Sequence, residues 1–211
     1  MNTPKRINIS LLSITFILSP RNAVVNQKRF IMQKLFIASL VGAFIMFVWS
    51  YMAWMILPIH ANTFMYTPAQ DAIMNVLAEN NLESGTYGMP SAPAKEEQIK
   101  IMKENAGKPG AAVFYTKEDP GMGASQMVYG FIFNFILVFA ACTLLANNMK
   151  GSFFSRWWMV MMVAVIIIFG VYMLQWNWMG YTWNYTRDFV FDATMGWAIN
   201  GLWLAWYMGR K

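Results

Sequence analysis

The stretch LFIASLVGAFIMFVWSYMAWMILPI, residues 35–59, decides the fold because it runs for about 25 residues without a charged side chain. A helix rises ~1.5 Å per residue, so a segment of this length crosses the ~30 Å hydrocarbon core of a bilayer with some length left for tilt. A lone apolar segment in lipid must satisfy its own backbone hydrogen bonds, and a helix does so. The stretch therefore predicts a transmembrane helix.

The composition indicates the same class of protein. Hydrophobic residues make up 57% of the 211 residues and charged residues only 12%, about half the share of an average soluble domain. So few charges do not cover the surface of a soluble protein of this length. The single cysteine, Cys142, excludes an intrachain disulfide and a cysteine-based metal cluster.

Three more apolar runs follow, and each is long enough to span a bilayer: 127–147, 157–176 and 189–208. The sequence thus predicts an all-α membrane protein with four transmembrane helices. The long polar segment between the first two, residues 60–126, is expected to form a small extracytoplasmic α/β insert.

Residues 1–34 lead into the first predicted span. A basic start and an apolar run at 7–18 are typical of a signal peptide, but the run is too short to span and no A-x-A-like site follows at a suitable distance. Two interpretations stay open. The segment is either a cytoplasmic, interfacial amphipathic lead-in or lies upstream of a true start at Met32, since MQKLFIASLVG is an ordinary start for an inner-membrane protein.

The insert has locally readable helix and strand signals. Helices are expected at about 67–79 and 94–105, and strands at 85–89 and 111–115. Thr67 to Gln70 has the pattern of a capping box with proline at the first helical position, and Gly107 is a natural helix stop. An insert of ~65 residues is near the lower limit for independent folding, so we expect it to lean on the membrane helices or on the lipid surface.

Charge asymmetry predicts the orientation. If residues 1–34 are cytoplasmic, the cytoplasmic segments carry ten Lys and Arg and no acidic residue, whereas the other side holds all ten Asp and Glu and six basic residues. Short loops rich in Lys and Arg stay in the cytoplasm, and four spans return both termini to that side. We therefore expect a multi-pass protein of the bacterial cytoplasmic (inner) membrane with N and C termini in the cytoplasm.

One face of the fourth predicted span is polar. Asp192, Gly196 and Asn200 recur every four residues, and Asn134 lies in the second span. An ionisable residue inside a span is a functional candidate, because an unpaired one costs roughly 2.5 kcal/mol or more at the bilayer centre.

The preferred interpretation of this face is structural, with a proton or cation pathway as the alternative. Asp192 is near the outer helix end, where Arg187 is close enough in sequence to pair with it. The two asparagines are then interhelical hydrogen-bonding residues, and Gly196 and Gly170 are points of close helix approach.

His60 is the only histidine and follows Pro58 at the outer interface. A metal or haem ligand is one interpretation, with Met52, Met55 and Met65 as soft ligands for Cu(I). The preferred one is an interfacial histidine bonded to the backbone, because the sequence offers no second histidine and a zinc site needs three or four ligands.

Motifs of catalysis are missing from the sequence, which has no glycine-rich phosphate loop, CxxC or HExxH. We expect a protein that is not an enzyme, with no cofactor and no nucleic-acid partner.

The order FVWSYMAWMILPIH, ESGTYGMP and AAVFYT resembles that of a group of small uncharacterised bacterial multi-pass membrane proteins. The resemblance implies a multi-pass membrane protein of that kind. It transfers no activity and no functional residue.

The leading functional hypothesis is a non-enzymatic accessory or interaction subunit that meets the lipid bilayer and another membrane protein. A small carrier or channel that uses Asp192, Asn200 and Asn134 is the alternative. A metal or redox subunit that uses His60 is the third hypothesis.

Overall fold

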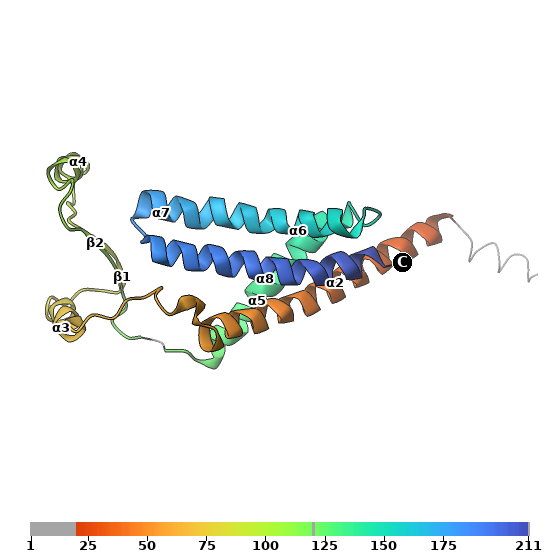
Figure 1. Cartoon of the computed structure of the whole chain (residues 1–211), viewed down its shortest axis with the longest axis horizontal. Coiled ribbons are helices and arrows are strands. Elements are labelled where there is room, and N and C mark those ends of the chain that lie inside the picture. The colour runs from red at the N-terminus through yellow and green to blue at the C-terminus, as the bar shows by residue number, and fades with distance from the viewer. Residues whose placement is uncertain (1–19, 120, 211) are drawn as a thin grey trace, which may run out of the picture.

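The structure, a computed structural model, describes residues 20–119 and 121–210, so the apolar run at 7–18 lies outside the described residues. Long helices form an elongated bundle from which a small insert projects at one end (Figure 1). The bundle helices are α2 (Pro20–Tyr51), α5 (Ala124–Ala146), α6 (Phe153–Ile167), α7 (Leu174–Met179) and α8 (Trp183–Gly209). The π-helical segment Ile168–Met173 joins α6 to α7 without a break in the rod.

Three helical rods are long and apolar enough to cross a membrane: Val24–Ile56, Ala124–Ala146 and Phe153–Met179. The segment 189–208 is helical as part of α8, but α8 is not one of the three. Asp192 and Asn200, together with its tryptophans and glycines, lower the hydropathy of this helix.

Helix α8 is the central helix of the bundle. It packs along α6 and α2 and also contacts α5. Trp197, Leu204 and Met208 of α8 are among the largest fully buried side chains. The buried polar residues of α8 therefore face other helices rather than the outside of the bundle.

Close packing of α2 on its neighbours depends on glycine. A Cβ at Gly42 would lie 2.7 Å from Val138 Cγ1 of α5 and 2.9 Å from Asn200 Oδ1 of α8. A Cβ at Gly196 would lie 2.9 Å from Trp49 Cδ1, so Gly196 is a close-approach point as predicted. The same prediction is wrong for Gly170, which has open space around its Cβ position because no neighbouring helix lies over it.

The insert contains two helices and a two-stranded sheet. These are α3 (Gln70–Glu79), β1 (Gly85–Met89), α4 (Lys95–Glu104) and β2 (Ala111–Tyr115). The strands are those predicted and pair antiparallel, with Gly85 opposite Tyr115. Helix α3 begins later than predicted, at Gln70, because the Thr67 hydroxyl accepts from the Ala69 N–H in a turn (3.3 Å) and does not cap the helix.

The insert has almost no core of its own. Among the apolar side chains between residues 64 and 119, only Leu77 and Tyr115 are buried. Helix α4 buries no residue at all. Neither α3 nor α4 packs extensively on the bundle. The insert is therefore attached to the bundle mainly through its two chain ends and through β2, which lies near the turn between α7 and α8.

Candidate functional site

A group of polar side chains lies where the chain leaves the first rod and enters the insert. We call it the polar cluster; its members are Trp49, His60, Thr63, Arg187, Asp188 and Asp192. Helix α2 passes into the π-helical segment Met52–Ile56, and extended Leu57 then breaks the helix. Pro58, with its fixed φ, opens a short 3₁₀ turn that ends at His60. This turn contacts α8 and places the His60 ring against it.

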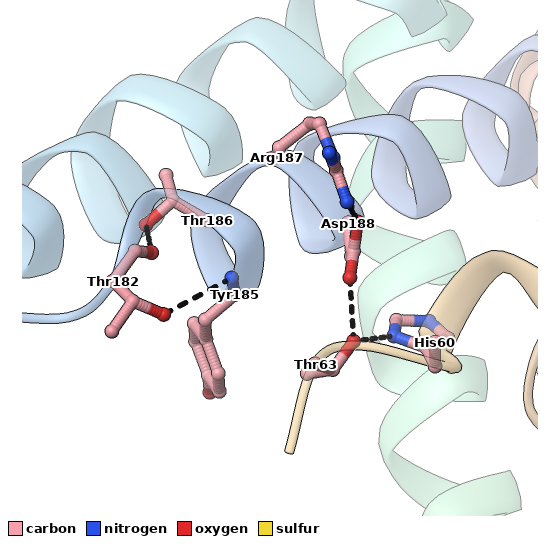
Figure 2. A network of polar contacts seen from close by, with 7 residues as sticks. All are labelled: His60, Thr63, Thr182, Tyr185, Thr186, Arg187 and Asp188. Atoms are coloured by element: carbon pink, nitrogen blue, oxygen red, sulfur yellow. Dashed lines mark hydrogen bonds and ion pairs between the residues drawn. The ribbon is translucent and has the colours of Figure 1, made fainter. Parts of the chain in front are cut away.

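A chain of hydrogen bonds joins this turn to the start of α8 (Figure 2). His60 Nδ1 lies 3.0 Å from Thr63 Oγ1, and the Thr63 hydroxyl donates to Asp188 Oδ2 at 2.9 Å. Arg187 donates from Nε and Nη2 to Asp188 Oδ1 at 3.0 and 2.8 Å. Since the hydroxyl proton points to Asp188, Thr63 accepts from His60, and Nδ1 of the imidazole carries a proton.

Two predictions about these residues are wrong. His60 bonds to the Thr63 side chain and not to the backbone, because the 3₁₀ turn brings the hydroxyl three residues on within reach. Arg187 pairs with Asp188 and not with Asp192, because Asp192 lies farther along α8, beside His60 and Trp49.

Asp192 forms the second carboxylate of the cluster. Its Oδ2 lies 3.4 Å from His60 Nε2, and its Oδ1 accepts a hydrogen bond from the Trp49 indole. The side chains of His60 and Asp192 are only 3% and 17% exposed. His60 Nε2 has no hydrogen-bond partner among the described residues, so its contact with the Asp192 carboxylate is a close approach without a hydrogen bond.

Aromatic rings enclose the histidine. Trp54 stacks on it with ring centres 3.9 Å apart and planes 6° apart, and Phe189 meets it edge-on at 5.3 Å. Rings on two sides lower the local dielectric constant, which strengthens the attraction between the imidazole and Asp192. The same burial makes loss of either partner costly.

The remaining predicted polar residues do not join the cluster. Asn200 is fully buried, and neither its amide nitrogen nor its amide oxygen has a hydrogen-bond partner among the residues that the structure describes. Asn134 is half-buried and forms no side-chain hydrogen bond with the described part of the chain. The predicted interhelical amide bonds are therefore not formed within the described residues. Asn200 Oδ1 lies against Gly42, which has no side chain to bond to it, and the other side chains near Gly42 are the apolar Val138 and Leu204.

The cluster offers few metal ligands. Within residues 20–119 and 121–210, no three His, Cys, Asp or Glu side chains are grouped so that they could hold a metal ion. His60 and Asp192 form a pair, and the next polar atoms are the Thr63 hydroxyl and the Trp49 indole, which donates only.

Sequence reasoning missed Thr63, Trp49 and the role of Asp188. Asp188 and Asp192 are four residues apart, and this spacing places both carboxylates on one face of a helix. This spacing was the feature of the sequence that could have placed Asp188 in the same site as Asp192. Thr63 and Trp49 gave none, because their partners lie 125 and 143 residues away in the chain.

The site and fold were compared with protein-family models, with curated proteins and with solved structures, and none of the three comparisons gave a match. The functional argument therefore depends on the geometry of this chain.

Proposed function

We propose that the protein is a non-enzymatic interaction subunit of the bacterial cytoplasmic membrane, and that its extracytoplasmic insert binds another protein. In this proposal α8 is the fourth span, shielded by α2 and α6, and both chain ends are cytoplasmic. The single observation that carries the proposal is the lack of a core in the insert.

The insert exposes apolar side chains on each of its parts. Met65 and Tyr66 before α3 are 80% and 77% exposed, Met102 of α4 is 66% exposed and Phe114 of β2 is 65% exposed. Exposed apolar groups gathered in one small unit mark interaction surfaces in soluble segments. A partner that covers them would supply the stabilisation that the insert cannot supply for itself.

The charge of the insert argues for a protein partner with a basic surface. Residues 61–123 contain eight acidic and five basic side chains, which leaves a net charge of −3. This charge repels a second insert and also an anionic lipid surface. It attracts a basic protein surface and raises the rate of association with it.

A groove beside β2 provides a specific place for contact. It has a volume of about 810 Å³ and lies between β2 and the turn that joins α7 to α8. Phe64, Phe114 and Tyr185 are among its lining residues. Because β2 pairs only with β1 in the described structure, it keeps one unpaired edge, and an extended segment of a partner can bond to such an edge.

In this proposal the polar cluster has a structural role. It ties the first residues of the insert to α8 through Thr63 and Asp188. This contact fixes the place where the insert leaves the bundle, so that the groove and the exposed apolar side chains keep one orientation relative to the bundle.

Site-specific photo-crosslinking in native membranes tests the proposal. A photoreactive residue at Phe114 or Met102 should give a discrete adduct with a different protein, whereas one at exposed Phe133 on α5 should give none. Replacing both Glu96 and Glu97 by Lys should reduce the adduct yield, because the partner surface is basic. An adduct of twice the chain mass, or a yield unchanged by the charge reversal, would contradict the proposal.

Cysteine labelling tests the orientation. The only native cysteine, Cys142, is buried, so it gives little background. In intact cells a membrane-impermeant maleimide should label Lys103→Cys in the insert and should leave Lys150→Cys unlabelled until the cells are opened. Labelling of both positions in intact cells would rule out the proposed orientation.

A second candidate, a proton-coupled carrier, is favoured by the buried pair of His60 and Asp192. For this function, Asp192→Asn in proteoliposomes should abolish proton-driven flux, because the amide still accepts from the Trp49 indole but no longer carries the charge. Flux equal to that of the wild type would remove the carrier from consideration.

A further inference from the structure

A cavity of about 890 Å³ is lined by residues of α2, of the turn between α5 and α6 and of the C-terminal end of α8. These segments lie at the end of the bundle opposite the insert (Figure 1). Four of the lining side chains are cationic: Lys34, Lys150, Arg156 and Arg210. We call it the basal cavity.

No acidic residue lines the basal cavity, although two of its cations are buried. Lys34 is 6% exposed and Arg156 is 8% exposed. Buried charges in proteins are ordinarily paired with an opposite charge. The ion pairs among the described residues all lie elsewhere, in the insert or in the polar cluster.

Backbone carbonyls satisfy only part of the hydrogen-bonding capacity of these cations. Arg156 donates from Nε to the Ala205 carbonyl at 2.7 Å and from Nη1 to the carbonyls of Met149 and Gly151. Lys34 donates to the Arg210 carbonyl. Within the described chain no residue accepts from Arg156 Nη2, and the Lys34 ammonium has two further N–H groups.

The fold makes room for this arrangement. A Cβ at Gly209 would collide with the Arg156 guanidinium, so the absence of a side chain there admits the cation. Arg210 is fixed beside it, with its guanidinium 4.3 Å from the centre of the Trp206 ring. The cations are thus held in place by the fold, and within residues 20–119 and 121–210 no acidic side chain pairs with them.

A smaller groove of about 370 Å³ adjoins the basal cavity and shares Phe30, Lys34 and Arg210 with it. It continues along α2 to Ile37 and beside Tyr207 of α8. Phe30 and Ile37 are 54% and 46% exposed and belong to a rod apolar enough to span a membrane. The groove therefore places exposed apolar side chains, Phe30 and Ile37, directly beside the cations Lys34 and Arg210. This order, a cationic cavity followed by apolar side chains along a membrane helix, matches that of a phospholipid headgroup and its acyl chain.

We propose that the basal cavity binds the phosphate of an anionic phospholipid, with an acyl chain in the adjoining groove. A lipid headgroup and a soluble phosphate offer the same phosphate oxygens to the cavity. The adjoining groove favours the lipid, because a soluble phosphate has no acyl chain to place there. Guanidinium and ammonium donors match phosphate oxygens, and basic sites between helices at a membrane surface bind such headgroups.

The test is lipid binding to the purified full-length chain, measured by native mass spectrometry with dioleoylphosphatidylglycerol and with dioleoylphosphatidylcholine. The wild type should retain the anionic lipid in preference to the zwitterionic one. Lys34→Gln should weaken retention of the anionic lipid about five-fold, the effect of one basic residue near an anionic lipid. Lys28→Gln removes the same charge from exposed α2 surface outside the cavity and should change it less than about two-fold.

If Lys34→Gln does not fold, Arg210→Gln at an exposed position provides the same comparison. Equal retention of the two lipids, or equal losses in Lys34→Gln and Lys28→Gln, would overturn the proposal. A further arm adds inorganic phosphate and measures thermal stability. Stabilisation by phosphate equal to that by the anionic lipid would overturn the lipid assignment.

Discussion

Gly42→Leu is expected to destabilise the bundle by about 3 kcal/mol, the upper end of the usual cost of overpacking a core. The position lies where α2 meets both α5 and α8, and even a Cβ there would be 2.7 Å from Val138 Cγ1. The neighbour on the α8 side is Asn200, which is fully buried. The measurement is thermal unfolding of the purified protein in detergent.

Gly130→Leu is the matched control. It makes the same substitution in α5, but nothing lies within 4 Å of the Cβ position at Gly130. Leucine has a higher helix propensity than glycine, so this variant should be as stable as the wild type or slightly more stable. Equal losses in the two variants would show that the close approach at Gly42 is not what limits stability.

The second large effect is expected from the pair His60 and Asp192. His60→Ala and Asp192→Ala should each lower stability by about 3 kcal/mol, because each leaves a buried polar partner without its counterpart. The double variant should cost less than the sum, with a coupling energy of at least about 1 kcal/mol in a double-mutant cycle.

The exposed pair Lys117 and Glu83 is the control for this cycle. Its atoms are closer, at 3.0 Å, but its side chains are 54% and 80% exposed. Water screens such a pair, so its coupling energy should not exceed about 0.5 kcal/mol. A coupling energy for His60 and Asp192 no larger than this would mean that the contact between His60 and Asp192 does not stabilise the protein.

Local patterns predicted much of the fold. Uninterrupted apolar composition over the length of a bilayer predicted the three long rods. Two short segments that follow the helices of the insert, one of them with the β-favouring run Val113 to Tyr115, predicted both strands. These signals are local, because each lies within the element that it predicts. Helix α8 differs from the three rods, because its polar residues lower its hydropathy although they pack against other helices. Hydropathy along the sequence does not report which helices cover such a residue.

The candidate site was predicted residue by residue but not as an assembly. His60 and Asp192 stood out as rare ionisable groups near apolar runs, yet their contact spans more than half of the chain. The partner of Asp192 depends on a 3₁₀ turn after Leu57 and on the approach of Trp49, and neither has a signature in sequence spacing. Asn200 shows the opposite case, since it was predicted to bond across helices and its side chain has no hydrogen-bond partner in the described part of the chain.

The missing core of the insert has a consequence for the life of the protein in the cell. A segment with few buried contacts opens readily, and proteases cleave such segments first. If the insert binds a protein as proposed, copies made in excess of that protein would be degraded, while bound copies would persist. The cellular amount of this chain would then follow the supply of the bound protein, and stoichiometry would be set by turnover rather than by synthesis.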